Sequence, residues 1–454
     1  MAISTFFIPQ GCPMQDESEK QDMLQWQIVN KAINRYIKHY QKITDLLCFK
    51  SKKITKVLLV TSLIYMLFFS VASFAKVARN FDWYQWRGPD RNGLSSEKGW
   101  MTAWQEGGPK QLWKTSVGTG FSAVSVSKGR VYTIGNASKK DTVFCFDAET
   151  GKEIWKYSYP CEETGDFAGP ASTPTVDSKR VYTFSRQSDL FCFDSVTGKV
   201  IWTRNIQKEF GSKSPEWRYS SSPLILGKMV IVDADFTIAL DKRTGEFIWK
   251  TESYEGGYSS PYPFYLGKSE RLAVYNSFGL VILDPKTGKE LGKQAWQLST
   301  KINVATPIIS DNKAFISAGY DKGCALVDIS TDKPFIIWEN KNMRNQFGSC
   351  VLWNGYLYGF DDSEELRCMD FQTGAVKWGQ RNMNRGGLMI ADGKLIIISQ
   401  QGELVIAVAS PEGFKQISRA KVLDGLCWTV PVLSNGRIYC RNQDGTLICL
   451  DVSR

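Results

Sequence analysis

Short apolar stretches recur along the chain from residue 122 to its end, each joined by a polar turn to another such stretch. One form reads FCFDAETGKEIW at 144–155 and FCFDSVTGKVIW at 191–202, and it returns at 238–249. A second hairpin pattern lies between successive copies, as in STPTVDSKRVYTFS at 172–185. Runs of this length, bounded by polar or glycine-containing turns, are typical of β-strands. Each pair of hairpins therefore predicts one antiparallel sheet of four strands.

The spacing of an aspartate in the first form sets the length of the repeat. This aspartate or its equivalent falls at 147, 194, 241, 284, 328, 370, 407 (an alanine) and 451, so successive copies are 37 to 47 residues apart. Such a period suits the four-stranded blades of a β-propeller. The seventh copy is recognised by its position more than by its residues. We predict an all-β, eight-bladed β-propeller.

Three residues of the repeat have distinct physical roles. The aspartate carboxylate can accept hydrogen bonds from amides of the turn. A glycine four residues later suits a reversal that needs a positive φ. The tryptophan that follows is a large flat side chain suited to packing against the next blade. The predicted structural residues are Asp147, Gly151 and Trp155; Asp194, Gly198 and Trp202; Asp241, Gly245 and Trp249; and Asp370, Gly374 and Trp378.

The two ends of the repeat region complement each other. The last copy ends with Asp451 to Arg454 and lacks its outermost strand. In contrast, QLWKTSVG at 111–118 is a strand-like segment with no aspartate turn before it. Placing Trp113 and its neighbours beside the last blade closes the ring and removes two open strand edges. We expect the N-terminal strand to complete the eighth blade.

The N-terminal residues predict a targeting segment. An apolar run at 57–75 follows several lysines and ends in the small residues Ser73 and Ala75, which is the pattern of an export signal. The run is also long enough for an uncleaved membrane anchor. We expect an exported protein of the periplasm or cell surface. The predicted parts are an extension at 1–50, with an amphipathic helix near 22–47 or a true start farther along, the signal or anchor at 51–75, a capping segment at 76–110 and the propeller at 111–454.

Composition narrows the chemistry that is open to the propeller. The sequence has one histidine, His39, in the extension, so downstream of it no histidine-based catalytic site or zinc site can form. The formal net charge of +10 is spread over 454 residues without a concentrated basic patch, which argues against a nucleic-acid partner. Cys440 and Cys449 flank a predicted turn, where they could form a disulfide or remain free.

The motif Asp-x-x-Thr-Gly-x-x-x-Trp resembles the repeat of pyrroloquinoline-quinone-like propellers over about 110–454. That superfamily includes quinoprotein dehydrogenases and the outer-membrane assembly factor BamB, both eight-bladed. Upstream, DWYQWRGPDRNG at 82–93 looks like the W-x-x-W-R-G-P opening of exported, mostly uncharacterised members. We expect this opening to cap the propeller.

The resemblance leaves a catalytic and a non-catalytic reading. Quinoprotein dehydrogenases of this fold use the quinone, a calcium ion, a catalytic aspartate and often a disulfide between adjacent cysteines. This sequence has no adjacent cysteine pair, and no residue matches the catalytic aspartate or the calcium ligands by motif. We therefore expect a non-catalytic binding protein with no cofactor and no bound metal. The alternative is a dehydrogenase that uses pyrroloquinoline quinone and calcium on alcohols or sugars.

In a propeller, the loops that lead into the inner strands share one face around the central channel. Their aromatic residues here can stack on sugars or peptide side chains, or can merely cover the ends of the blades. Their cations, including Lys301, can hold carboxylates or sulfates. The candidate ligand-binding residues are Trp217, Arg218, Tyr219, Tyr258, Asn303, Arg344, Phe347, Arg385 and Trp428, beside Phe121 and Phe167.

An acidic turn at 361–365 would either ligate calcium or remain solvated. Together these features predict a protein, peptide or glycan partner, no nucleic acid, and membrane contact only through 57–75 if that segment is not cleaved.

Overall fold

The computed structural model describes residues 31, 35, 38, 80–162 and 167–454 of the chain. Lys31, Arg35 and Lys38 are helical and exposed. The rest of the helix predicted near 22–47, and the apolar run at 57–75, lie outside the described residues. Within the described part, no helix is both long and apolar enough to cross a membrane. The chain divides into two compact units, Met1–Arg79 and Asn80–Arg454, and the second is considered from here on.

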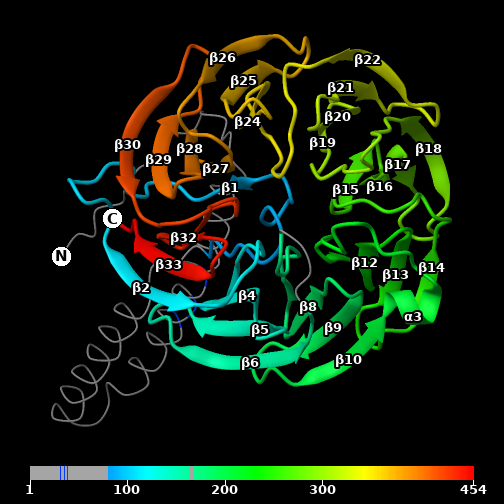
Figure 1. Cartoon of the computed structure of the whole chain (residues 1–454), viewed down its shortest axis with the longest axis horizontal. Helices are drawn as coiled ribbons and strands as arrows, with labels where there is room; N and C mark the ends of the chain where they lie inside the picture. The colour runs from blue at the N-terminus through cyan, green and yellow to red at the C-terminus, as the bar shows by residue number, and fades with distance from the viewer. Residues whose placement is uncertain (1–30, 32–34, 36–37, 39–79, 163–166) are drawn as a thin grey trace. The chain divides into compact units, whose positions relative to one another are not determined.

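Eight sheets of antiparallel strands are arranged in a ring, as Figure 1 shows. Blade 1 contains β3 (Ser125–Ser127), β4 (Arg130–Ala137), β5 (Lys140–Asp147) and β6 (Glu153–Pro160). Blade 2 contains β7 (Thr175–Asp177), β8 (Arg180–Phe184), β9 (Asp189–Asp194) and β10 (Val200–Asn205), followed by the short helix α3 (Ile206–Phe210). Blade 3 contains β11 (Leu224–Leu226), β12 (Met229–Asp233), β13 (Thr237–Asp241) and β14 (Phe247–Lys250). Blade 4 contains β15 (Tyr262–Leu266), β16 (Ser269–Tyr275), β17 (Gly279–Leu283) and β18 (Glu290–Ala295).

The second half of the ring repeats this order. Blade 5 contains β19 (Ile308–Ser310), β20 (Lys313–Ala318), β21 (Gly323–Asp328) and β22 (Phe335–Asn340). Blade 6 contains β23 (Val351–Trp353), β24 (Tyr356–Phe360), β25 (Leu366–Asp370) and β26 (Val376–Gln380). Blade 7 contains β27 (Gly386–Ala391), β28 (Lys394–Ser399), β29 (Glu403–Val408) and β30 (Lys415–Lys421), with β1 (Leu94–Ser95) added in parallel to β27. Blade 8 contains β31 (Val432–Ser434), β32 (Arg437–Arg441), β33 (Thr446–Asp451) and β2 (Gln111–Ser116).

The ring closes through its two ends, as the sequence predicts. Strand β2 pairs antiparallel with β33, and Trp113 lies opposite Cys449. Every blade thereby has four antiparallel strands, and the open edges that the two ends would otherwise present to solvent are removed. The eight-bladed architecture and its closure by an N-terminal strand are confirmed.

The recurring turn chemistry of the repeat is visible in blade 1. The carboxylate of Asp147 accepts hydrogen bonds from the amides of Glu149 and Thr150 and from the Thr150 hydroxyl. Gly151 then takes a φ of 70°, a conformation that favours glycine. Asp194 and Thr197 make the same bonds in blade 2. The aspartate thus satisfies the amides of a tight turn between the third and fourth strands.

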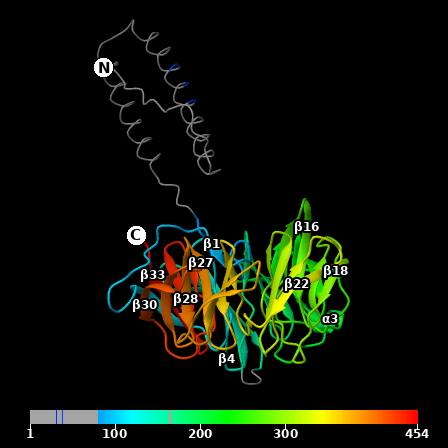
Figure 2. The ribbon, with the colours of Figure 1, turned by 90° about the horizontal axis from the view of Figure 1, so that it is seen from above.

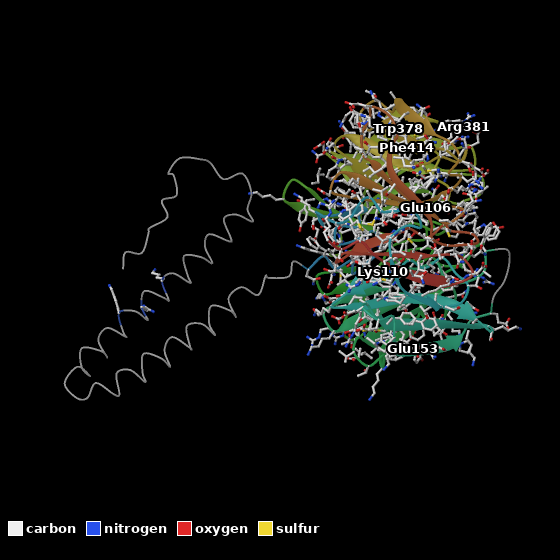
Figure 3. The ribbon with its side chains drawn as sticks, turned by 90° about the vertical axis from the view of Figure 1, so that its left-hand side faces the viewer. Glu106, Lys110, Glu153, Trp378, Arg381 and Phe414 are labelled. Atoms are coloured by element: carbon white, nitrogen blue, oxygen red, sulfur yellow. The ribbon has the colours of Figure 1, made fainter. Side chains whose placement is uncertain are left out.

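Each repeat tryptophan lies on the turn of the following blade. The Trp155 indole N–H donates to the Ser195 carbonyl at 3.1 Å, and a Cβ added at Gly198 would lie 2.6 Å from the Trp155 ring. The absence of a side chain at Gly198 is therefore what admits the ring. Equivalent indole bonds run from Trp113 to Ala148, Trp202 to Lys242, Trp249 to Pro285, Trp338 to Gln372 and Trp378 to Ser410. Figure 3 shows Trp378 with Phe414 of the next blade, their ring centroids 5.8 Å apart.

Two seams between blades lack this tryptophan. The position in blade 4 is Gly292, where an added Cβ would lie 2.7 Å from the Asp332 carbonyl oxygen of blade 5. The position in blade 7 is Ser418, whose hydroxyl donates to the Thr102 carbonyl. The Met101 amide donates to the Val452 carbonyl beyond β33, and Trp100 is buried in the adjoining core. The segment before β2 therefore fills the seam between blades 7 and 8.

The strand register corrects one detail of the predicted repeat. Val408, and not Ala407, occupies the aspartate position of blade 7, because it pairs with Lys394 as Asp147 pairs with Arg130.

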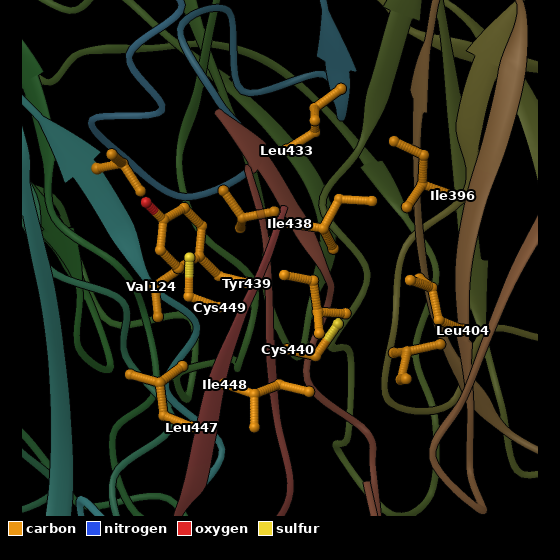
Figure 4. Packing of buried hydrophobic residues seen from close by; sticks show 14 of the residues in the cluster. Val124, Ile396, Leu404, Leu433, Ile438, Tyr439, Cys440, Leu447, Ile448 and Cys449 are labelled. Carbon is orange, nitrogen blue, oxygen red and sulfur yellow. The ribbon is translucent and has the colours of Figure 1, made fainter. Parts of the chain in front are cut away.

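In blade 8, Cys440 lies opposite Ile448. Figure 4 shows Cys440 directed toward blade 7 and Cys449 toward blade 1. Both thiols are free, so the disulfide considered from the sequence is absent.

Candidate functional site at the mouth of the channel

The ring has two different faces around its central channel. We call one the mouth face: it contains the loops that lead into the inner strands and the turns between the second and third strands. The other, the cap face, contains the turns of the inner hairpins and the segment Asn80–Glu97, which we call the cap segment. Figure 2 shows the ring edge-on, with β1 at the cap face and the end of β4 at the mouth face.

A cavity of about 180 Å³ lies at the mouth face. Loops from seven blades and the cap segment line it, because the inner strands of all blades converge on the channel. The lining side chains are mostly aromatic or small and polar: Trp86, Phe121, Phe167, Ala171, Arg186, Trp217, Tyr219, Ser220, Ser222, Tyr258, Ser260, Ile302, Val304, Tyr320, Phe347, Ser349, Trp428, Thr429 and Val430.

Five aromatic side chains form a contiguous group at this cavity, here called the mouth cluster: Phe121, Phe167, Trp217, Phe347 and Trp428. Phe347 and Trp428 stack with centroids 4.3 Å apart, and Phe121 lies on Trp428 at 5.9 Å. Phe167 contacts Trp217 edge-on at 5.3 Å and Trp428 at 5.8 Å. Phe167 is 36% exposed, so the cluster presents apolar surface to solvent.

The cap segment supplies the opposite wall of the cavity. Trp86 lines the cavity, and its indole N–H donates to the Thr306 hydroxyl at 3.2 Å. Two buried arginines hold the segment: Arg87 donates to the Cys350 carbonyl, and Arg91 donates to the carbonyls of Ser222 and Pro223. Burial lowers the pKa of Arg87 to about 10 and that of Arg91 to about 9. Both remain cations near neutral pH, held by carbonyl dipoles.

Five of the nine predicted ligand-binding residues line the cavity: Trp217, Tyr219, Tyr258, Phe347 and Trp428. The Tyr258 hydroxyl accepts a hydrogen bond from the Trp217 backbone amide, which ties the Tyr258 ring to the loop that carries Trp217. Tyr219 is buried and its hydroxyl pairs with the Ser212 hydroxyl. Burial raises the pKa of both tyrosines, which makes neither of them a base near neutral pH.

The other four predicted residues lie outside the cavity lining. Asn303 is fully buried and donates to the Asn276 carbonyl, so it holds loops together. Arg218 is exposed beside Trp217. Arg344 donates to both carboxylate oxygens of Asp361.

Arg385 pairs with Asp362 and also lies 5.7 Å from the Phe347 ring centroid. Lys301, which the sequence adds to these cations, pairs with Glu255. The cations of the mouth face are therefore largely matched by carboxylates of the protein itself.

The acidic turn at 361–365 is tied into ion pairs with neighbouring arginines. Asp361 is fully buried and forms ion pairs with Arg344 and Arg367. Although desolvation opposes it, hydrogen bonding from Arg344 leaves the pKa of Asp361 below its ordinary value. Glu365 pairs with Arg367 and Arg381. The turn is thus part of an ion-pair network in which Asp361 is fully buried, whereas the Glu364 side chain beside Arg385 remains 45% exposed.

Three lining residues do not follow from the sequence patterns. Trp86 was expected only in a capping role, Arg186 lies in the β8–β9 turn, and Tyr320 lies in the β20–β21 turn. Tyr320 has a φ of 55°, which is costly for a residue with a side chain. A tight turn of this kind leaves no periodic signal in the sequence, so only the fold shows that these side chains meet at the channel.

The cavity does not fit a quinone cofactor with calcium. Calcium requires six to eight oxygen ligands, mostly from carboxylates and carbonyls. The described lining contains no aspartate, glutamate or cysteine. Across the described residues, no group of three or more histidine, cysteine, aspartate or glutamate side chains is placed to hold a metal. We therefore assign no reaction step to such a cofactor.

Comparison with known structures supports the fold and not a particular chemistry. BamB from Moraxella catarrhalis is 16% identical, with a TM-score of 0.58 over 76% of this chain and 99% of that chain. The quinohemoprotein alcohol dehydrogenase from Comamonas testosteroni is 14% identical, with a TM-score of 0.57 over 84% of this chain and 82% of that chain. The computationally designed Ika8 protein is 12% identical, with a TM-score of 0.55 over 76% of this chain and 100% of that one.

A family model gives stronger evidence than these folds. No curated protein matches the sequence. The model described as outer membrane protein assembly factor BamB matches residues 97–170 and 163–380, which is more than half of the chain. The chain therefore belongs to the BamB-like family of pyrroloquinoline-quinone-like β-propellers.

Proposed function

We propose that this protein is an exported, non-catalytic binding propeller that holds an apolar side chain of a protein or peptide partner in the mouth cavity. The observation that carries the proposal is the mouth cluster, a contiguous aromatic surface at a cavity whose other described lining groups are mostly aliphatic, small or hydroxyl-bearing, with Trp86 and Arg186. Concave, mostly apolar sites with a few polar groups are the usual form of ligand sites.

The geometry favours a side chain of a protein over a sugar ring. A sugar stacks on an open aromatic face, but Phe347 covers one face of Trp428 at 4.3 Å, and Phe121 also lies against Trp428. The cavity of about 180 Å³ has room for one aromatic or branched side chain, since a dry cavity of about 150 Å³ accepts a benzene molecule. The family description, an outer membrane protein assembly factor, also fits a protein partner.

Export to the periplasm or cell surface is part of the same proposal. It is supported by the apolar run at 57–75 with its lysine flank, and by the membership of a family described by an outer membrane assembly factor. The dehydrogenase alternative has no comparable support, because the described cavity lining lacks a carboxylate that could serve as base or calcium ligand.

Binding of a peptide to the full chain tests the proposal. The probe is a capped 15-residue peptide rich in Phe and Leu, followed by tryptophan fluorescence and calorimetry. We expect Trp428→Ala to weaken binding about ten-fold or more, because buried aromatic anchors dominate interfaces. Phe335→Ala is the matched control, since Phe335 is 55% exposed on the outer strand β22, away from the cavity.

Three results would contradict the proposal. One is equal binding by the Trp428 and Phe335 variants. Another is binding of oligosaccharides such as cellotetraose in place of the peptide. The third is dye reduction with alcohols or sugars after quinone and calcium are added, which would favour the dehydrogenase alternative.

A further inference from the structure

A second hollow lies on the cap face, opposite the mouth. Its volume is about 830 Å³, and it lies between the cap segment and the inner strands of blades 1 to 4. We call it the cap groove. Tyr84, Asp90, Asp177, Ile225 and Tyr265 are among its lining residues. None of these residues belongs to the mouth cavity, so the groove is a separate feature.

The chain itself shows how an extended segment binds at this face. The Val126 amide of blade 1 donates to the Trp83 carbonyl at 2.9 Å, and the Val176 amide of blade 2 donates to the Tyr84 carbonyl at 2.8 Å. Consecutive carbonyls of an extended chain point in opposite directions. The cap segment therefore lies between two neighbouring inner strands and makes one hydrogen bond to each.

Blades 3 and 4 present the same amides without an acceptor. Ile225 lies opposite Val230, and Tyr265 lies opposite Glu270, which are the hairpin positions that Val126 occupies opposite Val131. The ladder leaves the amide at this position directed toward the channel side. In the part of the chain that the structure describes, neither the Ile225 nor the Tyr265 amide makes a hydrogen bond. Such unpaired strand edges are ready to accept an added segment.

The side chains of the groove indicate what that segment carries. Tyr265 is 67% exposed, and Ile225 and Leu226 are partly exposed, which gives apolar surface beside the two amides. The carboxylates that line the groove are Asp82, Asp90, Asp177 and Glu270, and the described cations that line it are Lys128 and Arg91. The Arg91 guanidinium is already bonded to carbonyls of the protein. Asp177 pairs with Lys242, and Asp82 accepts a hydrogen bond from the Lys128 amide. Asp90 and Glu270 therefore give the groove an acidic wall beside its apolar surface.

We propose that the cap groove binds an extended segment of another protein that alternates basic and apolar residues. Two consecutive carbonyls of that segment accept hydrogen bonds from the amides of Ile225 and Tyr265, as Trp83 and Tyr84 do in blades 1 and 2. The basic side chains face the groove carboxylates, and the apolar ones pack on Tyr265 and Leu226. This site is independent of the mouth cavity and of the function proposed for it.

A capped octapeptide of alternating Lys and Val, labelled for fluorescence anisotropy, tests the charge requirement on the full-length chain. We expect saturable binding that weakens with salt, and no binding of the matching Glu and Val octapeptide. Asp90→Lys should weaken binding about ten-fold, since Asp90 is exposed on the groove wall. Trp428→Ala, a change in the mouth cluster, should leave this binding unchanged.

A proline exchange tests the amide itself. Ile225→Pro removes one amide hydrogen from an edge strand, a position where proline is tolerated, and β15 already contains Pro263. We expect at least a ten-fold loss of affinity for the basic octapeptide. The matched control is Ile309→Pro, the same hairpin position in blade 5, which does not line the groove. Circular dichroism and thermal unfolding verify that both variants are folded.

Hydrogen exchange of the unaltered protein gives a measurement that does not depend on variants. The Ile225 and Tyr265 amides should exchange fast in the free chain and gain protection when the basic octapeptide is added, while Ile309 should not change. Three results would overturn the proposal: equal loss of binding in both proline variants, equal binding of the acidic octapeptide, or protection of Ile225 before any peptide is present. The last would assign the groove to this chain's own N-terminal residues or to a second copy.

Discussion

The seam between blades 1 and 2 and the seam between blades 7 and 8 are closed in different ways. In the first, Trp155 lies on Gly198 of the next repeat, 43 positions along the chain. In the second, the repeat position is Ser418, and the seam is filled by Trp100 to Trp104, more than 300 residues away in sequence. A local contact can form as soon as two repeats exist, whereas the distant one requires the whole ring.

Truncating a buried tryptophan at either seam should have the largest effect on the free energy of unfolding. Trp155→Ala should lower the free energy of unfolding by about 3–5 kcal/mol, the usual cost of truncating a buried tryptophan. Trp100 is 3% exposed, so Trp100→Ala should cost a similar amount. Urea denaturation measures both values. A much smaller loss for Trp100→Ala would show that the seam between blades 7 and 8 does not depend on the N-terminal segment.

Substitutions at two glycines separate the steric contact with Trp155 from the backbone strain that both positions share. Gly198 and Gly129 both have a φ of 72°, but a Cβ at Gly198 would meet Trp155 at 2.6 Å, and one at Gly129 has no atom within 4 Å. Backbone strain is therefore shared, and Gly198→Ala should be less stable than Gly129→Ala by about 1–3 kcal/mol of overpacking. Equal denaturation midpoints of the two variants would mean that the ring moves away freely.

The polar contact of the distant seam should have a smaller effect. Ser418→Ala removes the hydrogen bond to the Thr102 carbonyl, which is worth about 0.5–1.5 kcal/mol. The loss should appear in the denaturation midpoint without a change in the slope of the transition. Ser299→Ala is a suitable control, because Ser299 is exposed and its hydroxyl makes no hydrogen bond to another described residue.

The smallest expected effect is a difference in how stability changes at low pH between a repeat with the turn aspartate, such as blade 2, and the repeat of blade 7, which lacks it. Hydrogen bonds from the amide and the hydroxyl of Thr197 hold the pKa of Asp194 below its ordinary value of 3.8, whereas blade 7 has Val408 at that position. A lowered pKa stabilises the fold above the unfolded-state pKa, and this stabilisation is lost as pH falls through the folded-state value. Asp194→Asn should therefore flatten the fall in stability below about pH 4, and an unchanged slope would contradict the assignment.

The sequence predicts what is local and repeated. The alternation of strand residues, the aspartate turns and the Trp155–Gly198 type of contact follow from patterns that return at each period, and the unpaired segment around Trp113 predicts the closure. The sequence does not predict that Val408 takes the aspartate position of blade 7, because that repeat has neither the aspartate nor the tryptophan.

The mouth face was predictable only in part. Trp428 and Phe347 follow from their place in loops before inner strands, so their convergence at the channel is a consequence of the fold class. The pairing of Arg344 with the buried Asp361, and the arrival of Trp86 from the cap segment, depend on tertiary contacts between blades. Such contacts have no spacing rule, so no pattern in the sequence reveals them.

The pairing of β2 with β33 also has a consequence for the order of events on the ribosome. The strand around Trp113 is among the first of the ring to be synthesised, and its partner β33 (Thr446–Asp451) is the last strand of the ring. Because domains fold as synthesis proceeds, the early strand must wait unpaired until the strands of all the intervening blades have been made. A nascent chain interrupted before Thr446 would hold the strands of seven complete blades and still be an open arc.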